Sequence, residues 1–216
     1  RDCDGEPRSI LTTVNPTPRI DDIDQASCTG SGISITPTDG TIPSGTIYSW
    51  DIPTSLPSGA ITGGTSGTDE TIIAESELLN STNSPATLTY TVTPTTPDGC
   101  TSDPFTISVT VNPLGHVDNP GYQEFCNTDT ININCSSENT GGDTTYSWTN
   151  TNSAIGLSNS GSGNLNITAT NTTNDPITSS VTVTPTFEGC DGTPQTFTIT
   201  VNPAPQLDDP TVQIIF

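Results

Sequence analysis

A motif of fourteen residues occurs three times in this chain, and it constrains the fold more than any other feature. The copies begin at Cys3, Cys100 and Cys190, and each ends in Val-Asn-Pro. The cysteine lies 11 positions before that valine in all three copies (3 to 14, 100 to 111, 190 to 201). In the second copy, apolar and hydroxyl side chains alternate from Phe105 to Val111, which is the pattern of a strand with one buried face. The following proline predicts the end of that strand, so the motif predicts the last strand of a repeated β domain.

A second repeat surrounds the two tryptophans. Tyr-Ser-Trp occurs at Trp50 and at Trp148, which are 98 positions apart, and a cysteine precedes each tryptophan by 22 positions, at Cys28 and Cys126. We therefore expect two complete units in tandem. The expected limits are 1–18 for the last strand of a preceding repeat, 19–113 and 114–203 for the two complete repeats, and 204–216 for the first strand of a following repeat.

The runs of alternating Thr, Val and Ile, separated by Gly, Pro, Asn and Asp, predict an all-β fold. Roughly seven short strands in about 95 residues is the content of an immunoglobulin-like β-sandwich. In the first unit, 87–93 is expected to pair with 104–112 across an Asp-Gly turn. The segment 70–80 has apolar residues that also suit a short helix. We expect a strand there, because 164–169 of the second unit alternates cleanly.

The charge balance excludes two classes of partner. The chain has 3 Arg and no Lys against 24 Asp and Glu, and its formal net charge is −21. Nucleic acids and anionic membranes are bound through cationic side chains, so we expect neither as a partner. No apolar run is long enough to span a bilayer, and no signal peptide or lipidation motif is present. We expect no direct membrane insertion, and we expect the targeting information to lie outside this sequence.

The cysteine content and the lack of catalytic motifs indicate an extracellular protein that is not an enzyme. Six cysteines in a chain without Lys or Met are typical of an oxidising compartment. His116 is the single histidine, and no Cys-x-x-Cys or Cys/His zinc pattern occurs. Paired carboxylates serve glycosidases, but here the acidic residues repeat once per unit, whereas an active site is needed only once. No Ser-His-Asp order repeats, and no phosphate-binding loop is present.

The tryptophans allow two interpretations. Trp50 and Trp148 are a potential stacking platform for sugars, as in a carbohydrate-binding module. Both occupy the same register at the centre of their repeat, which favours a core tryptophan on the third strand of a sandwich.

Carboxylates gather at the expected joints between units. An acidic pair follows the valine of each Val-Asn-Pro by seven positions, and the turn before each last strand adds further acids. Ca²⁺ prefers six to eight oxygen ligands, so we predict calcium at these joints and no other cofactor; solvated surface charge is the open alternative. The predicted ligands are Asp21, Asp22, Asp98 and Asp103 for the first unit and Asp118, Asn119, Glu188 and Asp191 for the second, and the third pair is Asp208 and Asp209.

The cysteines are expected at opposite ends of each sandwich. Cys28 and Cys126 follow the first strand, whereas Cys100 and Cys190 precede the last one. A strand spans about 20 Å, but a disulfide requires Cα atoms within about 7 Å. This geometry predicts a bond between repeats, Cys28 to Cys190, with Cys100 and Cys126 pairing to units outside this sequence. Pairing within the repeats, Cys28–Cys100 and Cys126–Cys190, is the open alternative. Cys135 has no counterpart in the first unit and is expected to be free or to compete for Cys190.

The motifs of 19–203 resemble a known family. Tyr-Ser-Trp, Val-Thr-Val-Thr-Pro185, Gly-Cys and Thr-Ile-Thr-Val-Asn-Pro203 together resemble the PKD-like repeats of very large cell-surface proteins of Bacteroidota, among them adhesins used in gliding and exported by type IX secretion. The resemblance implies an immunoglobulin-like sandwich used as a repeating stalk segment, and it implies no catalysis. Thr130 and Thr144 follow aspartates in a pattern that resembles the O-glycosylation acceptor of this bacterial group, with a bare turn as the alternative.

Two functions follow from these observations. The first is a mechanical spacer in the shaft of a long adhesin or filament at the bacterial cell surface, with adjacent repeats of the same chain as partners. The second is a module that binds a glycan or another surface protein through loops at one end of the sandwich. Binding loops need exposed aromatic side chains, and the candidates are Tyr122, Phe125 and Phe187.

Overall fold

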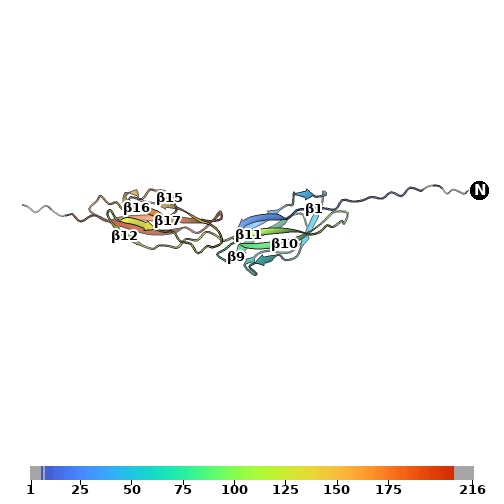
Figure 1. Cartoon of the computed structure of the whole chain (residues 1–216), viewed down its shortest axis with the longest axis horizontal. Helices are drawn as coiled ribbons and strands as arrows, with labels where there is room; N and C mark the ends of the chain where they lie inside the picture. The colour runs from blue at the N-terminus through green and yellow to red at the C-terminus, as the bar shows by residue number, and fades with distance from the viewer. Residues whose placement is uncertain (1–5, 7, 207–216) are drawn as a thin grey trace, which may run out of the picture. The chain divides into compact units, whose positions relative to one another are not determined.

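A computed structural model describes Glu6 and residues 8–206 of the chain. The chain forms two compact units, one of residues 1–79 with 86–111 and the other of 80–85 with 112–216. Each unit has its own hydrophobic core. In both, strands pair into sheets whose buried faces meet, and the fold is an all-β, immunoglobulin-like sandwich as predicted (Figure 1).

The main sheet of the first unit has six strands. Their order is β2-β11-β10-β5-β8, and β6 also pairs with β10. The strands are β2 (Ile23–Cys28), β5 (Ile47–Trp50), β6 (Thr54–Leu56), β8 (Gly67–Glu70), β10 (Ala86–Thr95) and β11 (Phe105–Asn112). The expected hairpin of the last two strands is confirmed, with Thr87 opposite Thr110 and Thr91 opposite Thr106.

The second sheet of this unit has the order β3-β9-β7, and a further two strands form a separate pair. The strands of the sheet are β3 (Ser31–Ile35), β7 (Ile61–Thr62) and β9 (Ile73–Asn80), and the pair is β1 (Arg19–Ile20) with β4 (Gly40–Thr41). The prediction of a strand in the 70s is therefore confirmed. Ile73 and Glu75 are buried at alternating positions of β9, and after an irregularity in the pairing with β3 the buried positions are Leu78 and Asn80.

The second unit repeats the main sheet with the order β12-β19-β17-β14-β15, and β18 also pairs with β17. The strands are β12 (Gln123–Cys126), β14 (Thr144–Asn150), β15 (Ser160–Ser162), β17 (Ile177–Phe187), β18 (Cys190–Asp191) and β19 (Gln195–Asn202). The opposite layer is the pair β13 (Thr130–Ile133) and β16 (Leu165–Thr168). A short 3₁₀ turn, η1 (Ser153–Ile155), follows β14.

The two main sheets share one register. Trp50 lies opposite Val92 in the first unit, and Trp148 lies opposite Val183 in the second. Equivalent residues of the two sheets can therefore be compared position by position.

The expected limits of the repeats stay predictions. Residues 8–18 form no strand, and Ile10, Leu11 and Val14 are exposed. The parts of these expectations that concern residues 1–5, 7 and 207–216 lie outside the described residues. No helix long and apolar enough to cross a membrane occurs in the described part of the chain.

Candidate functional site

Both tryptophans lie in the cores. Trp50 is 7% exposed and Trp148 is 8% exposed, and the position of Gly67 and Gly161 explains part of this burial. A Cβ atom at either glycine would overlap the neighbouring indole ring, so only glycine lets the adjacent strand cover it. With its faces covered, neither indole is available as a stacking platform for a sugar.

The indole nitrogens differ between the units. In the first, Nε1–H of Trp50 donates to the carbonyl oxygen of Thr65 at 2.8 Å. In the second, Nε1 of Trp148 is buried and has no hydrogen-bond partner among the described residues. A buried unpaired donor is costly, so the same fold position is satisfied in one unit and left unsatisfied in the other.

A buried carboxylate completes the network of the first unit. Oε1 of Glu75 accepts the backbone N–H of Thr65 at 2.8 Å and the hydroxyl of Tyr90 at 3.1 Å, and Oε2 accepts the Thr65 hydroxyl at 3.0 Å. Tyr90 is fully buried. Burial, followed by the Glu75 carboxylate, holds the pKa of the Tyr90 phenol well above its usual 10.0. Three donors thus replace the water that the carboxylate loses on burial.

The second unit has hydrocarbon at the same positions. Register places Ile167 where the first unit has Glu75, and Val181 where it has Tyr90. The polar network is therefore particular to the first unit. Sequence reasoning missed it, although the signal was present: Glu75 occupies an inward position of an alternating strand and aligns with an isoleucine.

A groove lies beside Trp50 on the main sheet of the first unit. β5 ends at Trp50 opposite Val92, and β6 returns to β10 with Thr54 opposite Thr89. Three residues, 51–53, therefore face two residues of β10, which is a β-bulge. Its consequence is that Ile52 is turned outward and is 72% exposed.

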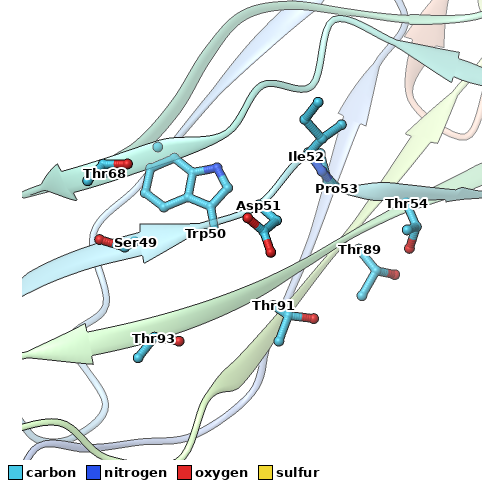
Figure 2. Close-up of a pocket in the computed structure, with 11 residues that line it drawn as sticks. Ser49, Trp50, Asp51, Ile52, Pro53, Thr54, Thr68, Thr89, Thr91 and Thr93 are labelled. Atoms are coloured by element: carbon cyan, nitrogen blue, oxygen red, sulfur yellow. The ribbon is translucent and has the colours of Figure 1, made fainter.

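The bulge opens a space of about 490 Å³. Figure 2 shows Thr89, Thr91 and Thr93 in a row along β10, with Asp51 and Ile52 above them. The remaining lining residues are Ser49, Trp50, Pro53, Thr54, Gly67 and Thr68. Sequence reasoning missed the groove, but the signal was Pro53, since a proline inside a strand pattern indicates a bulge.

At the same place the second unit has a smaller hollow of about 280 Å³. There β14 runs on without a bulge, so that Asn150 faces Val181. Thr149 stands in place of Asp51, and Asn150 stands in place of Ile52. Asn150 is buried, and its Nδ2 donates to the carbonyl oxygen of Leu157 at 2.8 Å.

The predicted acidic residues make local hydrogen bonds to the protein. Asp22 accepts the backbone N–H of Thr106 at 2.7 Å, and this bond lowers the pKa of its carboxyl. At the equivalent place in the second unit, Nδ2 of Asn119 donates to the carbonyl oxygen of Thr196 at 3.2 Å. In both units, therefore, this residue braces the start of the last strand of the hairpin.

Three other predicted ligands also have protein partners. Oδ2 of Asp118 accepts the Ser136 hydroxyl at 2.6 Å. Glu188 accepts the backbone N–H of Asp143 at 2.8 Å, and Asp191 accepts a threonine hydroxyl at 2.6 Å. The described residues contain no group of three or more His, Cys, Asp or Glu side chains that could hold a metal ion, so neither predicted set of acids is assembled into a cluster. Calcium binding itself stays a prediction.

The cysteines fall into two classes. Cys28 and Cys190 are disulfide-bonded. Cys100, Cys126 and Cys135 have free thiols. The alternative pairing within the repeats, Cys28–Cys100 and Cys126–Cys190, is therefore wrong, because one sulfur of each pair is unbonded. Burial raises the pKa of the Cys135 thiol.

A repeated asparagine turn precedes the longest strand of each main sheet. In 80–85, Oδ1 of Asn80 accepts the N–H and hydroxyl of Thr82 at 2.9 and 2.8 Å, and Nδ2 donates to Ser84. In 171–176, Asn171 makes the same bonds to Thr173 and Asp175, and its Nδ2 also donates to the carbonyl oxygen of Val201 at 2.8 Å. The sequences Asn-Ser-Thr-Asn-Ser-Pro and Asn-Thr-Thr-Asn-Asp-Pro are the signal that sequence reasoning missed.

The loop aromatics and the threonine acceptors differ in exposure. Tyr122 is 61% exposed, Phe125 is half-buried, and Phe187 is fully buried. Of the three aromatic candidates for a binding loop, Tyr122 alone is exposed. Thr130 is exposed at the start of β13, and Thr144 is half-buried at the start of β14. Glycosylation of these two threonines stays a prediction.

Comparison with known proteins identifies a domain in the first unit. Residues 25–115, which run from β2 past β11, match the family model of the PKD-like domain. Among curated proteins, none matches the sequence.

Several solved structures are similar to the chain at low identity. The fibronectin(III)-like modules of Clostridium thermocellum CbhA have 13% identity over 84% of this chain and 90% of theirs, with a TM-score of 0.37. Mouse cadherin-23 EC22-24 has 11% identity over 88% of this chain and 67% of its own, with a TM-score of 0.42. Drosophila N-cadherin EC1-4 has 11% identity over 88% of this chain and 50% of its own, with a TM-score of 0.41.

Proposed function

We propose that this chain is a structural segment of a secreted or cell-surface protein, in which β-sandwich units in series act as mechanical spacers. The observation that carries the proposal is that two sandwiches with one strand plan follow each other in a single chain. Each has its own hydrophobic core. The motifs that resemble the PKD-like repeats of Bacteroidota adhesins support a place in the shaft of such an adhesin.

A disulfide between Cys28 and Cys190 is part of this proposal. Both cysteines are disulfide-bonded, and three of the other four have free thiols. Cys3 is the remaining cysteine. Cys3 can form only one disulfide. If it bonded to Cys28 or to Cys190, the other of these two bonded cysteines would have no cysteine left to pair with, so a Cys28–Cys190 bond is the arrangement that accounts for both. The bond also supports an extracellular location, because disulfides persist in oxidising compartments.

The free thiols of Cys100 and Cys126 suggest that the same type of disulfide links further units of a longer array. Cys126 stands 98 positions after Cys28, and Cys100 stands 90 positions before Cys190. If each unit bonds to the next in this way, Cys126 pairs with a following unit and Cys100 with a preceding one. Repeat arrays are stabilised by each unit and by its links to its neighbours, so such bonds resist extension of the whole series.

A pulling experiment tests the mechanical function. The proposed bond encloses 162 residues (190 − 28). Pulled from its two ends, the oxidised chain cannot extend that segment, so full unfolding is expected to release about 550 Å less length than in the reduced chain, at 3.3–3.6 Å per residue. Cys126→Ser is the matched control and leaves the difference unchanged, whereas Cys28→Ser abolishes it.

Peptide mapping without reduction tests the pairing separately. The expected product contains the Cys28 and Cys190 peptides in one linked fragment. A linked fragment of Cys28 with Cys100 contradicts the proposal. With the Cys28–Cys190 fragment present, unfolding of the oxidised chain at no higher force than the reduced chain contradicts the mechanical role alone.

Calcium at the predicted carboxylates is a second test of rigid joints. An ion that binds only the folded chain stabilises it by an amount that rises with the logarithm of the ion concentration above Kd. We expect the Tm to rise with millimolar Ca²⁺ and to fall again with excess EDTA. A Tm that changes in neither condition contradicts calcium binding at the joint and leaves the disulfide as the proposed link between the units.

A further inference from the structure

The groove beside Trp50 has no role in a passive spacer. Both sandwiches share the strand plan and the buried tryptophan, but only the first interrupts its central strand with the bulge at 51–53. The second keeps a continuous strand and a hollow of little more than half the volume. A sandwich with this strand plan therefore folds without the bulge, and the groove of the first unit needs another explanation.

The lining of the groove is rich in hydroxyl groups. Six of its side chains are Ser or Thr, at Ser49, Thr54, Thr68, Thr89, Thr91 and Thr93. A hydroxyl both donates and accepts hydrogen bonds, so it suits a ligand whose own groups do both. The three threonines of β10 alternate along one face and span about 13 Å, at about 3.3 Å per residue. That length holds a short chain of sugar rings.

Asp51 and Ile52 provide two kinds of contact that hydroxyl groups cannot provide, a charged hydrogen-bond acceptor and an aliphatic surface. The Asp51 side chain is exposed, and its carboxylate can accept hydrogen bonds from two neighbouring hydroxyls of one sugar ring. Ile52 presents an aliphatic surface to which the C–H face of a sugar ring can pack. Both side chains are placed by the bulge, since its extra residue turns Ile52 out of the core position that Asn150 occupies in the second unit.

The charges decide the class of ligand. The chain has 3 cationic side chains, all at positions 19 and below, and a net charge of −21. An anionic ligand would meet a carboxylate without a compensating cation, so it is disfavoured. A ligand that is neutral and rich in hydroxyls matches the groove. We propose that the groove formed by Asp51, Ile52 and the β10 threonines binds a neutral oligosaccharide with neighbouring equatorial hydroxyls, as in β-linked glucose or xylose chains.

The site lies on the face of the main sheet, away from the end loops considered for a binding module above. An array of such units carries one groove for each unit with the bulge. Weak single sites can then act together along the array, because linked sites bind with an effective concentration in the millimolar range.

Titration calorimetry on the 216-residue chain tests the proposal, with cellohexaose, xylohexaose and mannohexaose as probes. We expect a Kd on the order of 1 mM or tighter for cellohexaose or xylohexaose. Mannohexaose is expected to bind more weakly, because its axial 2-hydroxyl leaves it without a neighbouring pair of free equatorial hydroxyls. Asp51→Asn is expected to raise that Kd about tenfold, because it removes the charged acceptor. Thr93→Val is expected to raise it about fivefold, because valine keeps the shape and the strand propensity and removes the hydroxyl.

Thr184→Val is the matched control, since Thr184 lies opposite Ser147 as Thr93 lies opposite Ser49. It is expected to leave the Kd unchanged. Three outcomes overturn the proposal: no heat with either cellohexaose or xylohexaose at millimolar concentration, binding that Asp51→Asn and Thr93→Val leave unchanged, or binding of tetralysine without binding of any sugar. The last result assigns the groove to a cationic peptide.

Discussion

The two sandwiches place different side chains at the same positions around a shared tryptophan. In the first unit, Trp50, Glu75 and Tyr90 belong to one hydrogen-bonded network that passes through Thr65. In the second, Ile167 and Val181 occupy the positions of Glu75 and Tyr90. The fold therefore requires an inward side chain of suitable size at these positions, and it does not require a polar one.

The difference has a cost on each side. A buried polar network is stable only when all its groups are paired, and that of the first unit pairs both carboxylate oxygens. The hydrocarbon of the second unit avoids this requirement, but it leaves Nε1 of Trp148 unpaired among the described residues. The second unit compensates at the end of β14, where Asn150 is bonded to Leu157 and to the Ser179 hydroxyl.

Alkaline pH should produce the largest difference in stability between the two units. The pKa of Tyr90 is raised by burial and by Glu75, so its contribution to stability is complete below pH 10.0 and is lost as the pH rises towards the folded pKa. We expect amide hydrogen exchange in β10 to accelerate above pH 10.0 before exchange in β17 does. Tyr90→Phe should remove most of this difference. Simultaneous acceleration in both strands, in the original chain and in the variant, would refute the comparison.

The asparagine turns provide the next largest effect. Asn171→Ala leaves the carbonyl of Val201 and the groups of Thr173 without their partners, and we expect a loss of about 3 kcal/mol in unfolding free energy. Asn80→Ala removes the equivalent bonds to Thr82 and Ser84 of the first turn, and we expect a loss of similar size. Urea denaturation measures both. Asn174→Ala, an exposed change in the same turn, serves as the control and should cost little.

Replacing the tryptophans tests the unpaired indole. Trp50→Phe loses packing and the hydrogen bond to Thr65, whereas Trp148→Phe loses packing and removes an unpaired donor. We expect Trp50→Phe to be the more destabilising by about 1 kcal/mol. Calorimetric unfolding of both variants gives the difference. Equal losses would mean that the indole of Trp148 is paired in solution.

The hydrogen bond from the backbone N–H of Thr106 to Asp22, at the start of the last strand, gives the smallest effect. The pKa of Asp22 is lowered by its bond to Thr106, so its contribution is present above pH 3.8 and is lost as the pH falls through the folded pKa. Asp22→Asn should therefore reduce the fall in Tm between pH 7 and pH 3. Asn119 is uncharged at the equivalent position, so the second unit has no such dependence there. Asp24→Asn is the control, and an equal change in both variants would show a general charge effect.

The sequence by itself determined the strands, the repeat and the place of the tryptophans. Alternation over 105–111 and 177–187 specifies which face is buried, because side chains of a strand point to opposite sides in turn. The spacing of 98 residues that separates Cys28 from Cys126 and Trp50 from Trp148 made the two units comparable before their contacts were known. These features are local, so a single chain shows them.

Tertiary structure alone decided the partners of the polar side chains. Glu75 and Tyr90 are 15 positions apart, and Asp22 and Thr106 are 84 positions apart; both pairs meet because strands of different sheets or distant segments are packed together. Four of the acids predicted as calcium ligands accept hydrogen bonds from nearby backbone or hydroxyl groups, namely Asp22, Asp118, Glu188 and Asp191. The groove beside Trp50 likewise depends on how β5, β6 and β10 meet, since the extra residue of a bulge becomes visible only when the register of both strands is known.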